Sequence, residues 1–165
     1  MTDVSPLFQP FRIRGLELKN RIVMAPMTRS RSPGAAPNAD NVAYYARRAA
    51  ADVGLILSEG TLTRRKGASN DANIPLFWGK EPLEGWKKVI DAVHAAGGRM
   101  GPQIWHQGMS RKPGAGHFPD APSDGPSGVT LQGKKVSDEP SEAEVIDMAE
   151  AYADAAADAK RLGFD

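Results

Sequence analysis

The sequence contains no cysteine, few aromatic residues and no long apolar run. The absence of cysteine excludes disulfide bonds, thiolate nucleophiles and sulfur-ligated metal sites. No apolar run approaches the roughly 20 residues of a membrane-spanning helix. The first residues lack a basic stretch followed by an apolar one, so we expect no signal peptide. A net charge of +1 gives no reason to expect binding to nucleic acid or to an anionic membrane.

What is present fits an ordinary globular protein. The chain has 165 residues, of which 41% are hydrophobic and 25% charged, enough for one domain with a real core. We therefore expect a single domain over residues 1–165. The lack of cysteine is also compatible with a cytoplasmic location.

One pattern recurs along the chain: an amphipathic helix-like segment, a glycine, and then a short apolar strand. The spacing predicts helices over residues 41–52, 83–96 and 141–162, with strands at 21–25, 55–57, 100–105 and from 164 onward. Glycine after a helix is the expected left-handed cap that releases the chain into the next strand. Strands that alternate with helices of this length predict βαβ crossovers and a parallel sheet, hence an α/β fold.

Two local signals refine this prediction. Residues 11–18 alternate in polarity around a glycine, which indicates a small β-hairpin within residues 7–19 that could plug one end of a barrel. Ser141 and Glu144 form a capping-box pattern after Pro140, which predicts where the third helix begins.

The loops that follow the strands are long, and those that follow the helices are short. Residues 26–40, 58–82 and 106–140 hold most of the prolines and glycines. Long loops inside a compact domain are usually functional, and in parallel barrels the chemistry lies at the carboxyl ends of the strands. Surface elaboration without function is the alternative for these loops.

Three strands and the first residues of a fourth cannot close a barrel. An open parallel sheet that ended there would expose an unpaired edge. We therefore expect the chain to be a fragment, truncated at the start of strand 4.

Polar and small residues follow each predicted strand. Pro26 marks the point where ladder pairing ends, and Thr28 then presents a hydroxyl group. Gly60 would let a flat ligand approach the backbone closely. Gln103 and Trp105 are two residues apart on one strand, so they face the same side, where an amide would suit the edge of a cyclic imide such as a flavin pyrimidine. Each feature alone also fits an ordinary structural role.

Taken together and in order, these segments resemble the Old Yellow Enzyme family of FMN-dependent ene-reductases. The matching segments are residues 7–11, 19–29, 44–49, 58–61, 103–108 and 162–165. The resemblance covers nearly the whole chain and implies the N-terminal portion of a (β/α)₈ TIM barrel. It also implies non-covalently bound FMN, reduction by NADPH or NADH, and a substrate with an activated C=C bond such as an enone.

The resemblance also assigns roles to individual residues. It implies that the backbone after the first strand lines the flavin and that the Thr28 hydroxyl lies near the ring's O4, tuning its redox potential. It further implies that Gln103 pairs with the pyrimidine edge and that Trp105, with Thr28, shapes the substrate pocket. The implied cofactor-binding residues are Pro26, Met27, Thr28, Gly60 and Gln103.

The family's catalytic His and His/Asn pair and its tyrosine would follow Asp165, so we expect no catalytic residue in this chain. His94, His106 and His117 do not occupy those positions, and their spacing suggests no metal site. We interpret Tyr44 and Tyr45 as packing residues of the first helix.

Three functional hypotheses remain open. In the first, the chain supplies part of the flavin site of an ene-reductase, is inactive alone, and needs a complementary C-terminal barrel fragment or chain. In the second, it is a non-catalytic half-barrel, a folding or assembly fragment. In the third, the same barrel and flavin serve a related dehydrogenase that acts on amines or dienoyl thioesters.

Overall fold

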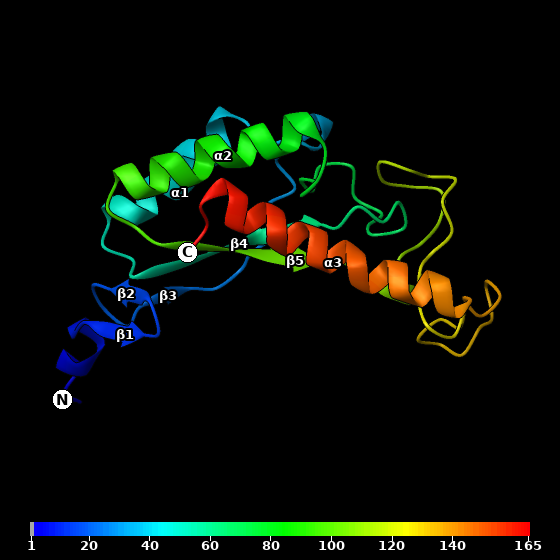
Figure 1. Ribbon diagram of the computed structural model, residues 1–165, viewed down its shortest axis with the longest axis horizontal. Coiled ribbons are helices and arrows are strands. Elements are labelled where there is room, and N and C mark those ends of the chain that lie inside the picture. Colours follow the sequence, from blue (N-terminus) through cyan, green and yellow to red (C-terminus); the bar gives the residue numbers. More distant parts are fainter. Residues whose placement is uncertain (1) are drawn as a thin grey trace.

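The computed structural model describes residues 2–165, which form two small β-sheets and three α-helices. Helices α1 and α2 lie side by side over the larger sheet, and α3 runs alongside it (Figure 1). The strands are β1 (Phe11–Ile13), β2 (Leu16–Leu18), β3 (Val23–Met24), β4 (Leu55–Leu62) and β5 (Met100–Trp105). The helices are α1 (Ala39–Ala50), α2 (Lys80–Ala95) and α3 (Glu142–Leu162), with 3₁₀ turns at Ser5–Phe8, Pro33–Ala35 and Gly108–Ser110.

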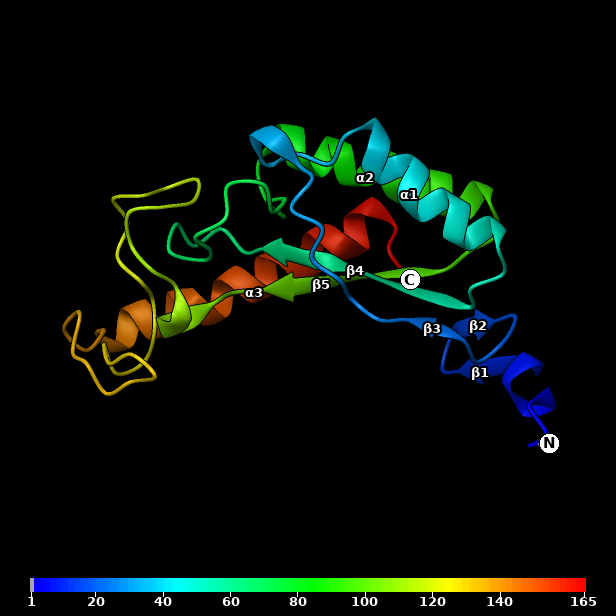
Figure 2. The same ribbon diagram turned by 180° about the vertical axis from the view of Figure 1, so that it is seen from behind.

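The larger sheet is parallel, with strand order β3-β4-β5. Helix α1 connects β3 to β4 and α2 connects β4 to β5, so the predicted βαβ units are confirmed. Figure 2 shows β4 and β5 running in the same direction toward the long loops. The carboxyl ends of the strands therefore lie together at one end of the sheet, as expected for a portion of a parallel barrel.

Strand β4 is longer than predicted. It continues to Leu62, so the segment Ser58-Glu59-Gly60-Thr61 lies inside the strand rather than after it, and the prediction of a strand end there was wrong. The pairing of β4 with β5 shifts register between Leu57 and Gly60 and is regular again from Gly60 onward. Serine, glutamate and glycine have low strand propensity, so only the ladder with β5 reveals the extension. In contrast, β3 is shorter than the predicted 21–25.

Two of the three helices begin earlier than the apolar pattern indicates. Asn38 caps α1 in a capping box with Asn41, and α2 begins at Lys80 rather than at residue 83. The predicted capping box of Ser141 and Glu144 on α3 is confirmed. Polar first turns carry no apolar periodicity, and for this reason the pattern misses them.

The glycine caps were predicted correctly for two helices of three. Gly163 after α3 and Gly97 after α2 adopt left-handed backbone. After α1 the positive φ of 63° falls on Asp52, not on Gly54. Gly54 is required for a different reason: a Cβ there would lie 2.5 Å from the Asn20 side-chain oxygen.

The core lies between the sheet and the helices. Trp86 and Val89 of α2 pack with Tyr45 of α1 and with Ile56 and Met100 of the sheet, all fully buried. Ile104 of β5 also packs against this cluster. Alternation along β5 therefore directs Gly101, Gln103 and Trp105 to the face that the helices leave uncovered.

The end of the chain lies beside β5. The Asp165 backbone N–H donates a 3.0 Å hydrogen bond to the Met100 carbonyl, and Phe164 packs against Phe77 and Trp86. Residues 164–165 form no strand of their own.

The predicted hairpin is confirmed as the antiparallel pair β1-β2. Its positive φ falls on Arg14 rather than on Gly15. The hairpin lies at the amino end of the larger sheet, opposite the long loops (Figure 2). A hollow of about 570 Å³ separates it from the turns at Gly54 and Gly97. Among the described residues, no helix is both long enough and apolar enough to cross a membrane.

Candidate functional site

The segment after β3 runs past the carboxyl end of the sheet. Pro26 is half-buried, while Met27 and Thr28 are exposed. The next residue is anchored: the Arg29 backbone N–H donates a 3.2 Å hydrogen bond to Glu59 Oε2 on β4. This bond holds the predicted flavin-lining segment against the strand that carries Gly60.

Strands β4 and β5 bring two further predicted residues together. Gly60 and Gln103 are direct partners in the parallel ladder. The Gln103 backbone N–H donates a 2.9 Å hydrogen bond to Ser58 Oγ across the register shift. Within residues 2–165, no hydrogen bond engages the side chain of Gln103 or of Thr28. An amide and a hydroxyl at this edge of the sheet are thus available to a ligand.

Trp105 lies against Gly60. A Cβ added to Gly60 would stand 3.0 Å from two atoms of the Trp105 indole, closer than normal packing allows. The predicted reason for this glycine was the approach of a flat ligand to the backbone. In the structure, the space beside Gly60 admits the indole of Trp105, so the glycine determines where that ring lies.

A buried carboxyl group, which sequence reasoning overlooked, lies behind the site. Glu59 is 1% exposed, and its Oε1 accepts hydrogen bonds from Asn41 Nδ2 and from the Tyr45 hydroxyl, both at 3.3 Å. The Tyr45 hydroxyl in turn accepts the Glu59 backbone N–H at 2.8 Å. Burial raises the pKa of Glu59, and the hydrogen bonds from Arg29, Tyr45 and Asn41 only partly offset this effect. One signal was visible: Asn41 and Tyr45 are four apart, on one face of a helix.

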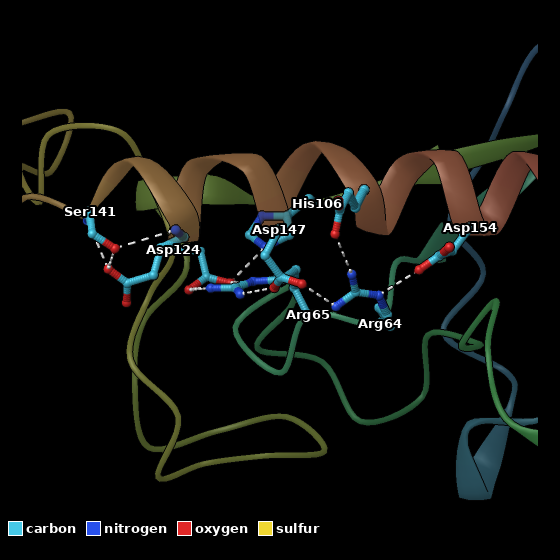
Figure 3. A network of polar contacts seen from close by, with 9 residues as sticks. Arg64, Arg65, His106, Asp124, Ser141, Asp147 and Asp154 are labelled. Carbon is cyan, nitrogen blue, oxygen red and sulfur yellow. Dashed lines mark hydrogen bonds and ion pairs between the residues drawn. The ribbon is translucent and has the colours of Figure 1, made fainter.

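A network of charged groups ties the long loops to α3 (Figure 3). Arg65 forms a two-point contact with Asp124, with both distances 2.9 Å, and also pairs with Asp147 of α3. Arg64 pairs with Asp147 at 2.6 Å and with Asp154 at 2.7 Å. The loop after β4, the loop after β5 and the third helix are therefore joined at the carboxyl end of the sheet.

His106, directly after β5, belongs to this network. The Gly108 backbone N–H donates to His106 Nδ1 at 2.8 Å, so the imidazole proton is on Nε2, which lies 3.4 Å from Asp124 Oδ2. Burial acts to raise the pKa of Asp124, but hydrogen bonds from His106 and Arg65 outweigh it and lower the pKa to about 2. His106 is thus a structural hydrogen-bond donor that fixes the loop beyond Trp105.

The remaining histidines and the two tyrosines of α1 have structural partners. His94 lies in α2 and pairs with Asp165 at 2.8 Å, and His117 contacts the Ile74 carbonyl at 3.0 Å. Within the described residues, no group of three or more His, Cys, Asp or Glu side chains could hold a metal ion. Tyr45 packs in the core as predicted, while the Tyr44 ring lies under the Arg48 guanidinium at 3.4 Å.

The chemistry of this edge suits a flat, largely uncharged heteroaromatic ring. It offers an amide, a hydroxyl and an indole, while the nearby carboxyl of Glu59 points away, toward α1. A parallel βαβ sheet with such residues at its carboxyl edge is typical of the class of α/β-barrel proteins that hold a planar cofactor at the barrel mouth.

Comparison with known proteins identifies the family. Residues 6–165 match the NADH:flavin oxidoreductase / NADH oxidase family. The chain belongs to this family, and its predicted membership of the Old Yellow Enzyme group is confirmed. The predicted cofactors, FMN with a reduced nicotinamide nucleotide, agree with the family.

Individual relatives give the same result. The chain is 40% identical to the flavin oxidoreductase hxnT of Emericella nidulans, over all of this chain and 45% of that protein. It is 41% identical to 12-oxophytodienoate reductase 7 of Oryza sativa, over 64% of this chain and 26% of that protein.

Solved structures confirm the fold. Morphinone reductase superposes with a TM-score of 0.83 at 34% identity, over 96% of this chain and 46% of that one. The Old Yellow Enzyme homologue of Zymomonas mobilis gives 0.81 at 34% identity, again over 96% and 46%. The chain therefore spans about half the length of these relatives and matches their N-terminal part.

Proposed function

We propose that this chain provides one side of an FMN site in an enzyme that uses NADPH or NADH to reduce activated C=C bonds, such as those of enones. The remaining strands of the barrel would provide the other side, including the catalytic groups. The observation that carries the proposal is the meeting of three elements at one sheet edge. The segment after β3 is anchored to β4, and Gly60 on β4 is paired with Gln103 on β5.

Each residue has a distinct role in this proposal. The Gln103 amide, with two N–H donors and a carbonyl acceptor, would bind the edge of the flavin pyrimidine. The Thr28 hydroxyl would donate to the ring oxygen on which negative charge accumulates upon reduction, and the backbone of Pro26 and Met27 would line the ring. Bound FMN supplies the hydride chemistry, which these residues do not perform.

The substrate side would be formed by the Trp105 indole. Gly60 admits the indole, and His106 restrains the chain that follows it. A large apolar ring at this position would exclude water and restrict which alkenes reach the cofactor. No residue of this chain is proposed to transfer a proton to substrate.

A reconstitution experiment tests the proposal. This chain would be continued, as one polypeptide, by the part of the Emericella nidulans relative that follows the matched region. We expect the purified protein to carry flavin absorbance and to oxidise NADPH when cyclohexenone is supplied, whereas the 165-residue chain alone should not. Gln103→Leu should weaken FMN binding roughly tenfold, the order expected for losing hydrogen bonds to a buried polar edge. Lys112→Leu, in an exposed part of the loop after β5, is the matched control.

The outcomes separate the hypotheses. A folded fusion protein that carries no flavin would overturn the proposal and favour a non-catalytic half-barrel. Flavin without enone reduction would reject the ene-reductase assignment and leave another flavin-dependent dehydrogenase.

A further inference from the structure

The Glu59 side chain joins three elements and is almost completely buried. Its Oε2 accepts the Arg29 backbone N–H at 3.2 Å, and its Oε1 accepts from Asn41 and Tyr45 on α1, each at 3.3 Å. Three donors on two oxygens match a carboxylate, which has about four lone-pair sites. A glutamine of the same shape has one acceptor oxygen in place of two, and an apolar side chain has none.

Burying the Glu59 carboxyl group lowers the stability of the fold, so another reason is needed for its presence here. The carboxyl group is 1% exposed, and none of the ion pairs among the described residues includes it. A buried carboxyl group without an ion-pair partner is held at the expense of stability, where an apolar residue would pack without that cost. What the carboxylate adds is a defined position for the groups that donate to it.

Those groups are next to the proposed cofactor site. The Arg29 N–H belongs to the peptide that it shares with Thr28, so fixing this N–H orients the Thr28 backbone. Gly60 directly follows Glu59 in β4, opposite Gln103. On the other side, the Tyr45 hydroxyl both donates to the carboxylate and accepts the Glu59 N–H at 2.8 Å, which ties β4 to α1 without involving the oxygen that Arg29 contacts.

We infer that Glu59 is a positioning residue: its carboxylate holds the segment with Thr28 at a set distance from Gly60 and Gln103. The inference rests on the proposed function, because the distance matters only if one ring spans these residues. Glu59 does not touch that ring and takes no part in proton transfer.

The first arm of the test needs no flavin. Amide hydrogen exchange of Arg29 would be measured in the 165-residue chain and in three variants. In Glu59→Leu, Arg29 loses its acceptor and should exchange at least roughly tenfold faster, as expected when a hydrogen bond of about 1.4 kcal/mol is lost. Glu59→Gln keeps one acceptor oxygen of the same shape and should give an intermediate rate. Tyr45→Phe is the matched control, because it removes a bond to α1 but leaves the Arg29 contact.

The second arm uses the fusion protein described above. Glu59→Leu and Glu59→Gln should shift the flavin midpoint potential and weaken FMN binding in the same order as they speed Arg29 exchange. Tyr45→Phe should lower the unfolding midpoint without shifting the potential. A structural role alone would lower stability in all three variants and leave the potential unchanged.

The two arms test the positioning role of Glu59 separately from the proposed FMN site. Unchanged Arg29 exchange in Glu59→Leu, or equal effects of Tyr45→Phe on exchange and potential, would overturn the positioning role. If Glu59→Leu does not fold, Glu59→Gln decides the question by the same two measurements. Loss of FMN binding in the unsubstituted fusion would reject the proposed function, while the exchange arm would still decide whether Glu59 holds the segment.

Discussion

Single side chains determine how the sheet edge is built. Gly60 and Gly101 lie on adjacent strands, yet their surroundings differ. A Cβ at Gly60 would meet the Trp105 ring at 3.0 Å, whereas one at Gly101 would meet Leu57 at an ordinary 3.6 Å. Each glycine lies within a strand, and the sequence does not show which of them is needed for packing. Only the contacts in the folded structure distinguish the two.

Gly60→Ala should therefore displace the Trp105 indole. The new methyl group cannot share that space, so the ring must move or β4 must shift, at a cost of about 1–3 kcal/mol. Gly101→Ala is the control and should change stability by less than about 1 kcal/mol. Urea unfolding and near-ultraviolet circular dichroism would measure both effects. Equal behaviour of the two variants would contradict the packing described for Trp105.

The Asp124 carboxylate should make stability depend on pH under acid conditions. Hydrogen bonds from His106 and Arg65 overcome the effect of burial and lower its pKa from 3.8 to about 2. A lowered folded-state pKa stabilises the fold above the unfolded-state pKa, and this stabilisation disappears as the pH falls from about 4 through about 2. Its size is roughly 2 kcal/mol.

The measurement compares the free energy of unfolding of the native chain and Asp124→Asn across this range. The difference between them should shrink by roughly 2 kcal/mol between about pH 6 and about pH 2. If the two proteins lost stability in parallel as the pH fell, the ionised form of Asp124 would not contribute to the stability of the fold.

At the scale of elements, helix ends differ in how far local chemistry determines them. Helix α3 begins at the predicted capping box and ends at the predicted glycine, because both signals are local backbone chemistry. After helix α1, the residue with positive φ is Asp52. Gly54 lies in close contact with Asn20, where a Cβ would not fit, so this glycine does not serve as the helix cap. A tertiary contact there overrides the usual use of glycine.

Ser141→Ala should destabilise α3. The substitution removes the acceptor for the Glu144 N–H, currently at 3.3 Å, and the expected loss is about 1 kcal/mol. Ser141→Thr keeps a hydroxyl and should retain most of the stability. Amide exchange in the first turn of α3 should rise for alanine and stay low for threonine. No change for alanine would mean that contacts elsewhere hold this turn.

At the scale of the whole molecule, apolar side chains on the edge strand β3 and on one helix, α3, are exposed. Val23 on β3 is 48% exposed, and Val145, Ile146 and Tyr152 on α3 are between 42% and 51% exposed. Apolar surface on two separate elements is typical of a surface that another polypeptide segment covers. The matched relatives are about twice as long as this chain.

The 165-residue chain should therefore bind a hydrophobic dye and associate as its concentration rises. Val23→Lys should reduce association with little effect on the unfolding midpoint, because a charge on an edge strand opposes strand pairing. Light scattering and dye fluorescence provide the measurements. A native chain that is monomeric at millimolar concentration without dye binding would contradict the exposure described here.

Much of this protein follows from local sequence. Alternating helices and strands, the hairpin and the cap of α3 follow from the sequence alone, because periodicity and turn chemistry act over a few residues. The candidate site residues Thr28, Gly60, Gln103 and Trp105 could also be named from the sequence. The family resemblance implies that these residues lie at one edge of a sheet.

Tertiary structure decided the rest. The extension of β4 depends on pairing with a strand some 40 residues later, since its own residues disfavour strand. The Glu59 cluster and the Arg65–Asp124–His106 network join residues from different elements, and no short-range pattern marks such pairs. Contacts between distant residues form only when the chain folds, so the position of the site, unlike its composition, is a property of the fold.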